Sequence, residues 1–191
     1  VTLSLAACWL AALEALAPVA RARGDTSLAD ELTERAARAR AAIAARFQTS
    51  AGYALGLEVD GRPRVHRTAM LAVPLLLGAV DPGDAADWFE AIASPRFSAP
   101  WGVRMIAADD PLFDPAGYHQ GAVWPLDTGW VSLAEWRGGR WPAALAHLRA
   151  NADLAEERAR GAFDEVLHGL ERRGAGICPD QGWSAAMVVS P

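Results

Sequence analysis

Lysine is absent from this chain of 191 residues, so all 18 of its basic side chains are arginine. We interpret this absence as a codon bias of the genome rather than as a functional signal. The 23 acidic side chains outnumber the basic ones and leave a net charge of −5. Nucleic-acid-binding domains need a basic surface, and this composition does not indicate one. We therefore expect no nucleic-acid partner.

Cysteine is scarce, and several catalytic motifs are missing. Cys8 and Cys178 form no CxxC or other metal-binding spacing, so we expect two buried free thiols, with a disulfide as the alternative. The chain has no HxxxH or HExxH motif and no phosphate-binding loop, and Ser184 lacks a GxSxG context. The histidines are dispersed, and His147 lies in a segment typical of a surface helix. We expect no metal, no cofactor and no serine-hydrolase chemistry.

The apolar N-terminal stretch, residues 1–20, has to be weighed as a signal or a membrane span. Glu14 and Pro18 interrupt it, no basic residue precedes it, and it is short for a span. We interpret it as a buried helix and expect no membrane partner and a cytoplasmic location. The chain starts at Val1 rather than at methionine, which indicates a piece of a longer protein.

Helical periodicity dominates the chain. Apolar residues recur every three to four positions over 3–17, and a second helix is expected to reach Phe47 after a capping box formed by Ser27 and Asp30. Leu28 and Leu32 are expected on its buried side. Further helices are predicted over residues 68–77, 82–92, 125–136, 142–158 and 181–189.

The remaining segments are predicted to be extended or irregular. Residues 52–66 alternate in polarity around a turn at Asp60 and Gly61, which predicts a small β-hairpin. Residues 94–124 show little helical periodicity and contain several prolines, and 161–178 is rich in glycine. Long irregular segments inside a compact domain are commonly functional. We expect one all-α domain over 1–191, with its ligand chemistry in loops.

The loop at 117–127, which reads GYHQGAVWPLD, combines aromatic and short polar side chains. Aromatic faces can stack on the C–H face of a sugar, and polar groups can bind its hydroxyls. Trp124 is equally typical of core packing. Asp127 falls in the first turn of the helix that Pro125 starts, where a capping role competes with substrate binding. The candidate sugar-binding residues of this loop are Tyr118, His119, Gln120, Trp124 and Asp127.

Two flanking clusters extend this candidate site. Arg104, close to Trp101, can donate two hydrogen bonds to sugar hydroxyls, or it can brace the loop by pairing with an aspartate at 109 or 110. Glu165 follows Asp164 in an apolar, glycine-bounded segment, where a partly buried carboxylate suits acid–base chemistry and an ordinary helix-start acid is the alternative. Gln181 and Trp183 add an amide and an indole near the end. Two carboxylates acting on a glycosidic bond need neither metal nor cofactor.

Four motifs in order resemble the C-terminal catalytic domain of bacterial glycogen debranching enzymes of the amylo-α-1,6-glucosidase type. The resemblance spans WGVRMIAADDPLFDPAGYHQGAVWPLDTGWVSLAEWRGG and extends through two later signatures. The first two patterns match at Gly102, Val103, Arg104, Tyr118, His119, Gly121, Val123, Trp124, Pro125 and Asp127. The later two match over residues 163–169 and at Cys178, Gln181, Trp183, Ala185 and Ala186.

This resemblance implies part of an (α/α)6 toroid of the six-hairpin glycosidase type, with the small β-hairpin near 52–66 as an excursion. It implies inverting hydrolysis of α-1,6-glucosidic branch points in a glycogen-like oligo- or polysaccharide, with Glu165 as the general base. In such enzymes the general acid is an aspartate upstream of the first helix of this chain, so the chain alone is expected to be nearly inactive.

One departure from the family pattern affects the specificity. Asp164 stands where these enzymes usually have proline, which puts the debranching subgroup in doubt. The alternatives are a six-hairpin glycosidase that acts on mannosylglycerate, glucosylglycerate or another oligosaccharide, and a helical domain that binds carbohydrate without catalysis.

Overall fold

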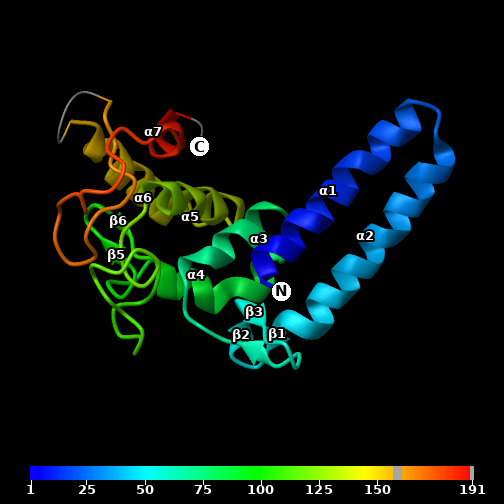
Figure 1. Cartoon of the computed structure of the whole chain (residues 1–191), viewed down its shortest axis with the longest axis horizontal. Coiled ribbons are helices and arrows are strands. Elements are labelled where there is room, and N and C mark those ends of the chain that lie inside the picture. The colour runs from blue at the N-terminus through cyan, green and yellow to red at the C-terminus, as the bar shows by residue number, and fades with distance from the viewer. Residues whose placement is uncertain (157–160, 190–191) are drawn as a thin grey trace. The chain divides into compact units, whose positions relative to one another are not determined.

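The computed structural model describes residues 1–156 and 161–189 and is mostly helical (Figure 1). Its internal contacts divide the chain into two compact units. The first unit comprises Val1–His66 and Val73–Ala85, and the second comprises Arg67–Ala72 and Ala86–Pro191. The predicted all-α class with only short strand pairs is confirmed.

The first unit is built on a helical hairpin of α1 (Leu3–Ala22) and α2 (Thr26–Phe47) (Figure 1). The Thr2 hydroxyl caps α1 by accepting a hydrogen bond from the Leu5 N–H at 3.3 Å. The prediction that this helix ends near residue 17 is wrong, because Pro18 lies inside α1. Proline in a helix interior removes one N–H donor and crowds the carbonyl four residues back, at a cost of about 3 kcal/mol, so α1 continues past Pro18 in spite of it. The buried stripe of α1 is Leu3, Ala7, Leu10, Leu13, Ala17 and Ala20.

Among the described residues, α1 is the one helix long and apolar enough to cross a membrane by length and composition, with 20 residues and a mean hydropathy of 1.8. Length and composition alone are weak evidence for a span, because a buried core helix passes the same test. A third of the apolar window of α1, 33%, is buried within this structure.

Helix α2 begins earlier than its sequence pattern predicted. The Asp25 carboxylate caps it by accepting a hydrogen bond from the Leu28 N–H at 3.0 Å. Asp30 instead pairs with Arg21 at 3.1 Å, so the predicted capping box is wrong. With this start, Leu28 is 42% exposed rather than buried. The buried positions of α2 are Ala29, Ala36, Ile43 and Phe47.

Two short antiparallel strand pairs follow α2 in the first unit. The second pair is the hairpin predicted at 52–66, and Gly61 occupies its turn with φ +84°, a conformation that favours glycine. The first pair was not predicted. The elements of this part are β1 (Gln48–Thr49), β2 (Gly52–Tyr53), β3 (Gly56–Leu57), β4 (Pro63–Arg64), most of α3 (Ala72–Leu76) and the 3₁₀ turn η2 (Pro82–Ala85).

The second unit contains the remaining elements. Helices α5 and α6 form another hairpin, and α7 packs against both. The predicted irregular segment at 94–124 holds a strand pair, β5–β6, that its prolines had hidden. The elements of this unit are η1 (Ala69–Leu71), α4 (Ala86–Ile92), β5 (Ser98–Ala99), β6 (Gly102–Val103), α5 (Pro125–Arg137), α6 (Trp141–Ala152), η3 (Asp153–Glu156) and α7 (Gly182–Val189).

The buried face of α6 differs from its hydrophobic pattern. The apolar Leu145 is 43% exposed, whereas His147, expected at the surface, is 5% exposed. The buried face is Ala144, His147, Ala150 and Asn151. The small alanines let neighbouring segments approach closely, and two polar side chains complete the face. The predicted end of this helix at 157–158 lies outside the described residues.

Both cysteines are free, and both are exposed, so the predicted burial of their thiols is wrong. Cys8 follows the buried Ala7 by one position on α1, and one helical step of about 100° turns it away from the core. Cys178 lies in an irregular surface segment with φ 39°.

Candidate functional site

A ladder of single β-bridges brings three distant segments of the second unit together. Arg104 pairs antiparallel with Val123, Val123 with Leu167, and Leu167 with Gly174. Val123 and Leu167 exchange both backbone hydrogen bonds, at 2.9 and 2.8 Å. The ladder therefore aligns the segments around Arg104, Trp124 and Glu165, although about 60 residues separate the outer two in sequence.

Glycine permits the close contact beside this ladder. A Cβ atom at Gly169 would collide with the carbonyl oxygen of Gly121, and one at Gly121 would collide with the carbonyl oxygen of Asp114. These two glycines let the loop at 117–121 lie directly against the loop that contains Glu165.

Arg104 holds these loops through their backbone. Its side chain is 7% exposed, its Nε donates to the carbonyl of Gly169 at 2.6 Å, and its Nη1 donates to the carbonyl of Pro95 at 3.0 Å. Burial lowers the pKa of this guanidinium. The ion pair considered for Arg104 does not form at Asp109, which pairs with Arg96 at 3.2 Å. Arg104 thus braces the loops through hydrogen bonds to backbone carbonyls rather than through an ion pair with Asp109.

Three rings of the 117–127 loop form one aromatic cluster. His119 stacks on Trp124, with centroids 5.4 Å apart and planes 7° apart. Tyr118 meets Trp124 edge-on at 4.5 Å and His119 edge-on at 4.6 Å. The Trp124 indole N–H donates to the carbonyl of Tyr118 at 2.8 Å, and its side chain is buried against Met105, Ala122 and Val166. Because His119 covers one face of Trp124, the exposed rim of the cluster belongs to His119 and the half-buried Tyr118.

Glu165 is a buried carboxylate with polar neighbours. It is 4% exposed, and the Gln181 amide donates to its Oε1 at 3.5 Å. Burial raises the pKa of Tyr118, and a side-chain hydrogen bond to Glu165 raises it further. The backbone also fixes the position of Glu165, because its N–H donates to the carbonyl of Cys178 at 3.2 Å. No helix begins at Glu165, so it is not a helix-start acid. A carboxylate held in this way can accept a proton from a water molecule.

Asp127 lies in the first turn of α5 and is 4% exposed. Its Oδ2 is buried without a hydrogen-bond partner among the described residues. Burial raises its pKa to about 7. This oxygen is enclosed by the protein, so the structure shows no access for a ligand hydroxyl, and the sugar-binding role of Asp127 stays a prediction.

The other predicted residues surround this centre. The half-buried Trp101 donates its indole N–H to the carbonyl of His168 at 3.2 Å. Gln120 is exposed, and Trp183 on α7 is 46% exposed. Ring contacts and hydrogen bonds thus join Tyr118, His119, Trp124, Glu165 and Gln181 into one group, while Arg104 and Trp101 are attached to the Glu165 loop.

Sequence reasoning missed Thr128. Its hydroxyl donates to the Trp124 carbonyl at 2.8 Å and accepts from the Val103 N–H at 2.9 Å, which ties α5 to the β5–β6 hairpin. The signal available was its position four residues after Trp124 at a helix start, where threonine commonly bonds the carbonyl one turn back. No group of three or more His, Cys, Asp or Glu side chains in residues 1–156 and 161–189 is placed to hold a metal ion.

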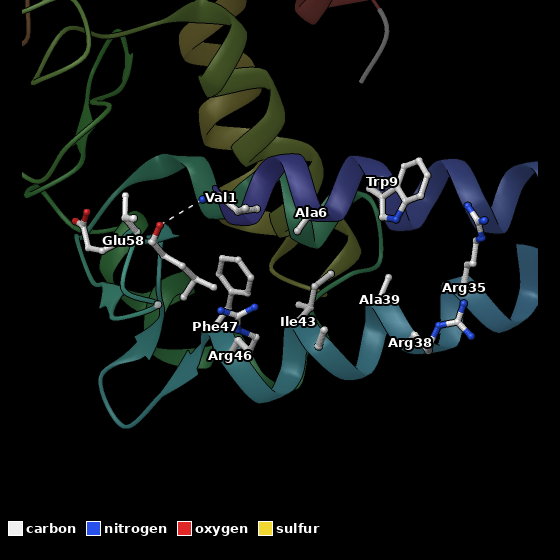
Figure 2. Close-up of a pocket in the computed structure, with 14 residues that line it drawn as sticks. Val1, Ala6, Trp9, Arg35, Arg38, Ala39, Ile43, Arg46, Phe47 and Glu58 are labelled. Carbon is white, nitrogen blue, oxygen red and sulfur yellow. Dashed lines mark hydrogen bonds between the residues drawn. The ribbon is translucent and has the colours of Figure 1, made fainter.

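A groove lies elsewhere, within the first unit, along α1 and α2 (Figure 2). Its volume is about 640 Å³. Ile43 and Phe47 line it with apolar surface, while Arg38 and Arg46 add charge and Trp9 adds an indole. None of the predicted sugar-site residues lines this groove, so its size does not bear on the chemistry at Glu165.

The comparisons with known proteins agree with a glycosidase fold. Residues 2–184 match the family model of the mannosylglycerate hydrolase MGH1-like glycoside hydrolase domain. No curated protein matches the chain in sequence. A GH63 mannosylglycerate hydrolase from Thermus thermophilus, solved with Tris, superimposes with a TM-score of 0.81 at 21% identity, covering 99% of this chain and 44% of that one.

Two further solved structures are similar. The same Thermus thermophilus hydrolase with Tris and D-glycerate gives a TM-score of 0.80 at 21% identity, covering 99% of this chain and 45% of that one. A glycosidase E335A in complex with glucose gives 0.73 at 23% identity, covering 98% and 50%. The chain therefore spans about half the length of these structures or less, and at these identities they show the fold alone.

The predicted partial six-hairpin glycosidase fold is confirmed, and the predicted superfamily with it. The narrower assignment to the glycogen debranching enzymes is not supported, since the family model that matches is a different one. Over nearly its whole length, from residue 2 to residue 184, this chain belongs to the family of the mannosylglycerate hydrolase MGH1-like glycoside hydrolase domains.

Proposed function

We propose that this chain supplies the base-bearing part of an inverting glycoside hydrolase that acts on a small glycoside of the mannosylglycerate type. One observation carries the proposal: Glu165, a carboxylate that is 4% exposed, contacts the Gln181 amide beside a cluster of three aromatic rings. A sugar ring can stack against such rings, while the carboxylate acts on a water molecule beside it.

In this mechanism Glu165 takes a proton from water as the water oxygen attacks the anomeric carbon. The bond to the leaving-group oxygen breaks, and a second carboxyl group protonates that oxygen. An inverting pair of carboxyl groups stands about 6.5–9.5 Å apart to leave room for the water. We place the general acid outside this chain. Gln181 and Tyr118 would orient the Glu165 carboxylate toward the water.

The preference for a small glycoside rests on the family match. The α-1,6 branch point of a glucan was the first expectation from sequence, and mannosylglycerate was an alternative. The matching family model names mannosylglycerate hydrolase, and one similar structure was solved with D-glycerate. These facts favour the alternative over the branch point. The proposed partner is accordingly a carbohydrate substrate.

The test is substrate profiling of the full-length protein by proton NMR. Mannosylglycerate, glucosylglycerate and an α-1,6-glucosyl dextrin would be offered to the wild type, to Glu165→Gln and to Glu171→Gln. Glu171 is a matched control, because it lies in the same loop but is exposed and paired with Arg173. We expect release of the β-anomer from a glycerate glycoside, a loss of about 10²-fold or more for Glu165→Gln, and little change for Glu171→Gln.

Other outcomes would overturn parts of the proposal. Cleavage of the dextrin alone would return the specificity to branch points. Release of the α-anomer would refute inversion. Full activity of Glu165→Gln would refute the base assignment, and binding of a glycoside without turnover would indicate a carbohydrate-binding domain.

A further inference from the structure

A buried row of polar side chains connects α5, α6 and β5 within the second unit. The Glu135 Oε2 lies 2.7 Å from His147 Nδ1, and His147 Nε2 lies 2.7 Å from the Ser98 Oγ. Glu135 is 0% and His147 5% exposed, and Ser98 is half-buried. The proposed reaction does not use any of these three residues.

The row has the order of a serine-hydrolase triad, Ser98, His147 and Glu135, but its hydrogen bonds point in the wrong direction for that chemistry, because His147 donates to Ser98. The Ser98 hydroxyl also lies 2.7 Å from the carbonyl oxygen of Ile92 and donates to it. A hydroxyl has one proton and a carbonyl can only accept, so the contact with His147 needs a proton on Nε2. A histidine protonated at Nε2 cannot take a proton from Ser98. The row is therefore a chain of donors and acceptors that fixes geometry.

At the Glu135 end of the row, a single hydrogen bond joins His147 to the carboxyl group. One proton lies between His147 Nδ1 and Glu135 Oε2, whichever of the two atoms holds it. The second oxygen of Glu135, Oε1, is buried with no hydrogen-bond partner among the described residues. His147 is consequently the group that binds Glu135 in this row, and removing it would leave a buried carboxyl group without its hydrogen bond.

Ser98 transmits this restraint to the β5–β6 hairpin. It pairs with Val103 in the hairpin, and Arg104 donates its N–H to the carbonyl of Phe97 at 2.9 Å. On its other side the hairpin reaches the loop that contains Glu165. Trp101 donates to the carbonyl of His168 at 3.2 Å, and Arg104 Nε donates to the carbonyl of Gly169 at 2.6 Å.

We propose that His147 is a positioning residue for the Glu165 loop. By holding Ser98, it keeps the β5–β6 hairpin in the register that places Trp101 and Arg104 against the carbonyls of His168 and Gly169. The positioning itself needs no substrate. Its consequence for catalysis rests on the proposed glycosidase function.

Two substitutions at one position separate the two ends of the row. In His147→Gln the longer amide can place an N–H near the former Nε2 and still donate to Ser98. In His147→Asn the shorter amide can place an N–H near the former Nδ1 and still donate to Glu135, but it does not reach Ser98. Backbone amide exchange in the full chain, followed by NMR, would report on Val103, Arg104 and Gly169.

Relative to amides of α7, which report the folding of the same unit, we expect these three amides to exchange about five- to tenfold faster in His147→Asn and at close to the wild-type rate in His147→Gln. The α7 reference removes the general loss of stability that an unpaired Glu135 causes in His147→Gln. Should His147→Asn fail to fold, Ser98→Ala replaces it, because it removes a single hydroxyl and leaves the contact between Glu135 and His147. Unchanged exchange in Ser98→Ala would overturn the proposal, as would equal acceleration in His147→Gln and His147→Asn.

Two further readouts complete the test. The ¹⁵N signals of the His147 ring should show a proton on Nε2 in the wild type, and an unprotonated Nε2 would refute the order of donors. In the glycoside assay, His147→Asn should lower kcat more than His147→Gln does, and equal kcat values would overturn the catalytic consequence. If exchange behaves as expected while the wild type cleaves no glycoside, the positioning stands and the proposed function fails.

Discussion

Neutralising Asp127 is expected to abolish a large pH dependence of stability. Burial raises the pKa of Asp127 from 3.8 to about 7. A shift of one pKa unit corresponds to about 1.36 kcal/mol, so this carboxyl group would destabilise the folded state by about 4 kcal/mol when it is fully ionised. The substitution Asp127→Asn keeps the shape of the side chain and removes the ionisation.

The direction in which stability changes with pH follows from proton binding to Asp127. Between pH 4 and pH 7 the unfolded chain has lost the proton of Asp127 while the folded chain still holds it. Folding is therefore linked to proton binding, and stability falls as pH rises through this window. Below pH 4 both states are protonated, and above about pH 7 both are ionised, so the contribution of Asp127 becomes constant at each end.

Urea denaturation followed by tryptophan fluorescence would measure the effect at several pH values between 4 and 8. The difference in unfolding free energy between Asp127→Asn and the wild type should move in favour of the variant by about 4 kcal/mol across this range. Asp87 is a matched control, because it is an exposed aspartate in the first turn of another helix, α4. Its Asn variant should track the wild type. A difference for Asp127→Asn that stays constant with pH would refute the argument.

Three further predictions test the packing around the site and in the first unit. Gly102 has φ +137°, and a Cβ there would lie only 2.7 Å from Thr128 Oγ1, so Gly102→Ala should lower the unfolding free energy by several kcal/mol in urea titrations. Gly24 has φ +84° but lies in open space, so Gly24→Ala should lower it by only about 1 kcal/mol. Thr128→Val removes the acceptor of the buried Val103 N–H and should cost about 1–3 kcal/mol, with faster exchange of that amide; an unchanged rate would contradict the contact. Leu10→Ala, at a position that is 0% exposed, should lower the unfolding free energy by about 2–5 kcal/mol, and a loss below 1 kcal/mol would indicate a loosely packed hairpin.

The helices of this chain could be predicted where their buried faces are made of large apolar residues. The stripe on α1, from Leu3 to Leu13, stands out from its neighbours by size and spacing. The stripe on α6 does not, because its buried positions are two alanines, His147 and Asn151. A pattern based on hydrophobicity assigns the polar pair to solvent. Their burial depends on partners in other elements, such as Glu135 for His147 and the Pro125 carbonyl for Asn151.

The candidate site could be predicted in its residue types but not in its connections. Glu165 and the 117–127 loop were found through motif order, and these motifs pointed to the right superfamily. They did not separate a glycerate glycoside from a branched glucan, because aromatic rings and a carboxylate would serve either substrate. The sugar is selected by the shape of the whole pocket, which short motifs do not encode.

Backbone carbonyls explain why the connections were hidden. The sequence indicated Arg104 as a donor to sugar hydroxyls or to an aspartate, and Trp101 and Trp124 as candidate sugar-binding residues. In the structure all three donate to carbonyl oxygens, those of Gly169 and Pro95 for Arg104, His168 for Trp101 and Tyr118 for Trp124. Every residue has a carbonyl, so an acceptor of this kind leaves no mark on the sequence.

The same fact changes which substitutions matter for the site. A carbonyl moves with the backbone, so its position depends on the dihedral angles and the close contacts of its loop rather than on its own side chain. At Gly169 any Cβ would collide with the Gly121 carbonyl and displace the oxygen that Arg104 Nε binds at 2.6 Å. The loop of Glu165 is thus held by Arg104 only as long as residue 169 is glycine. Gly169 therefore determines the position of the Glu165 loop as directly as Arg104 does, although glycine has no side chain.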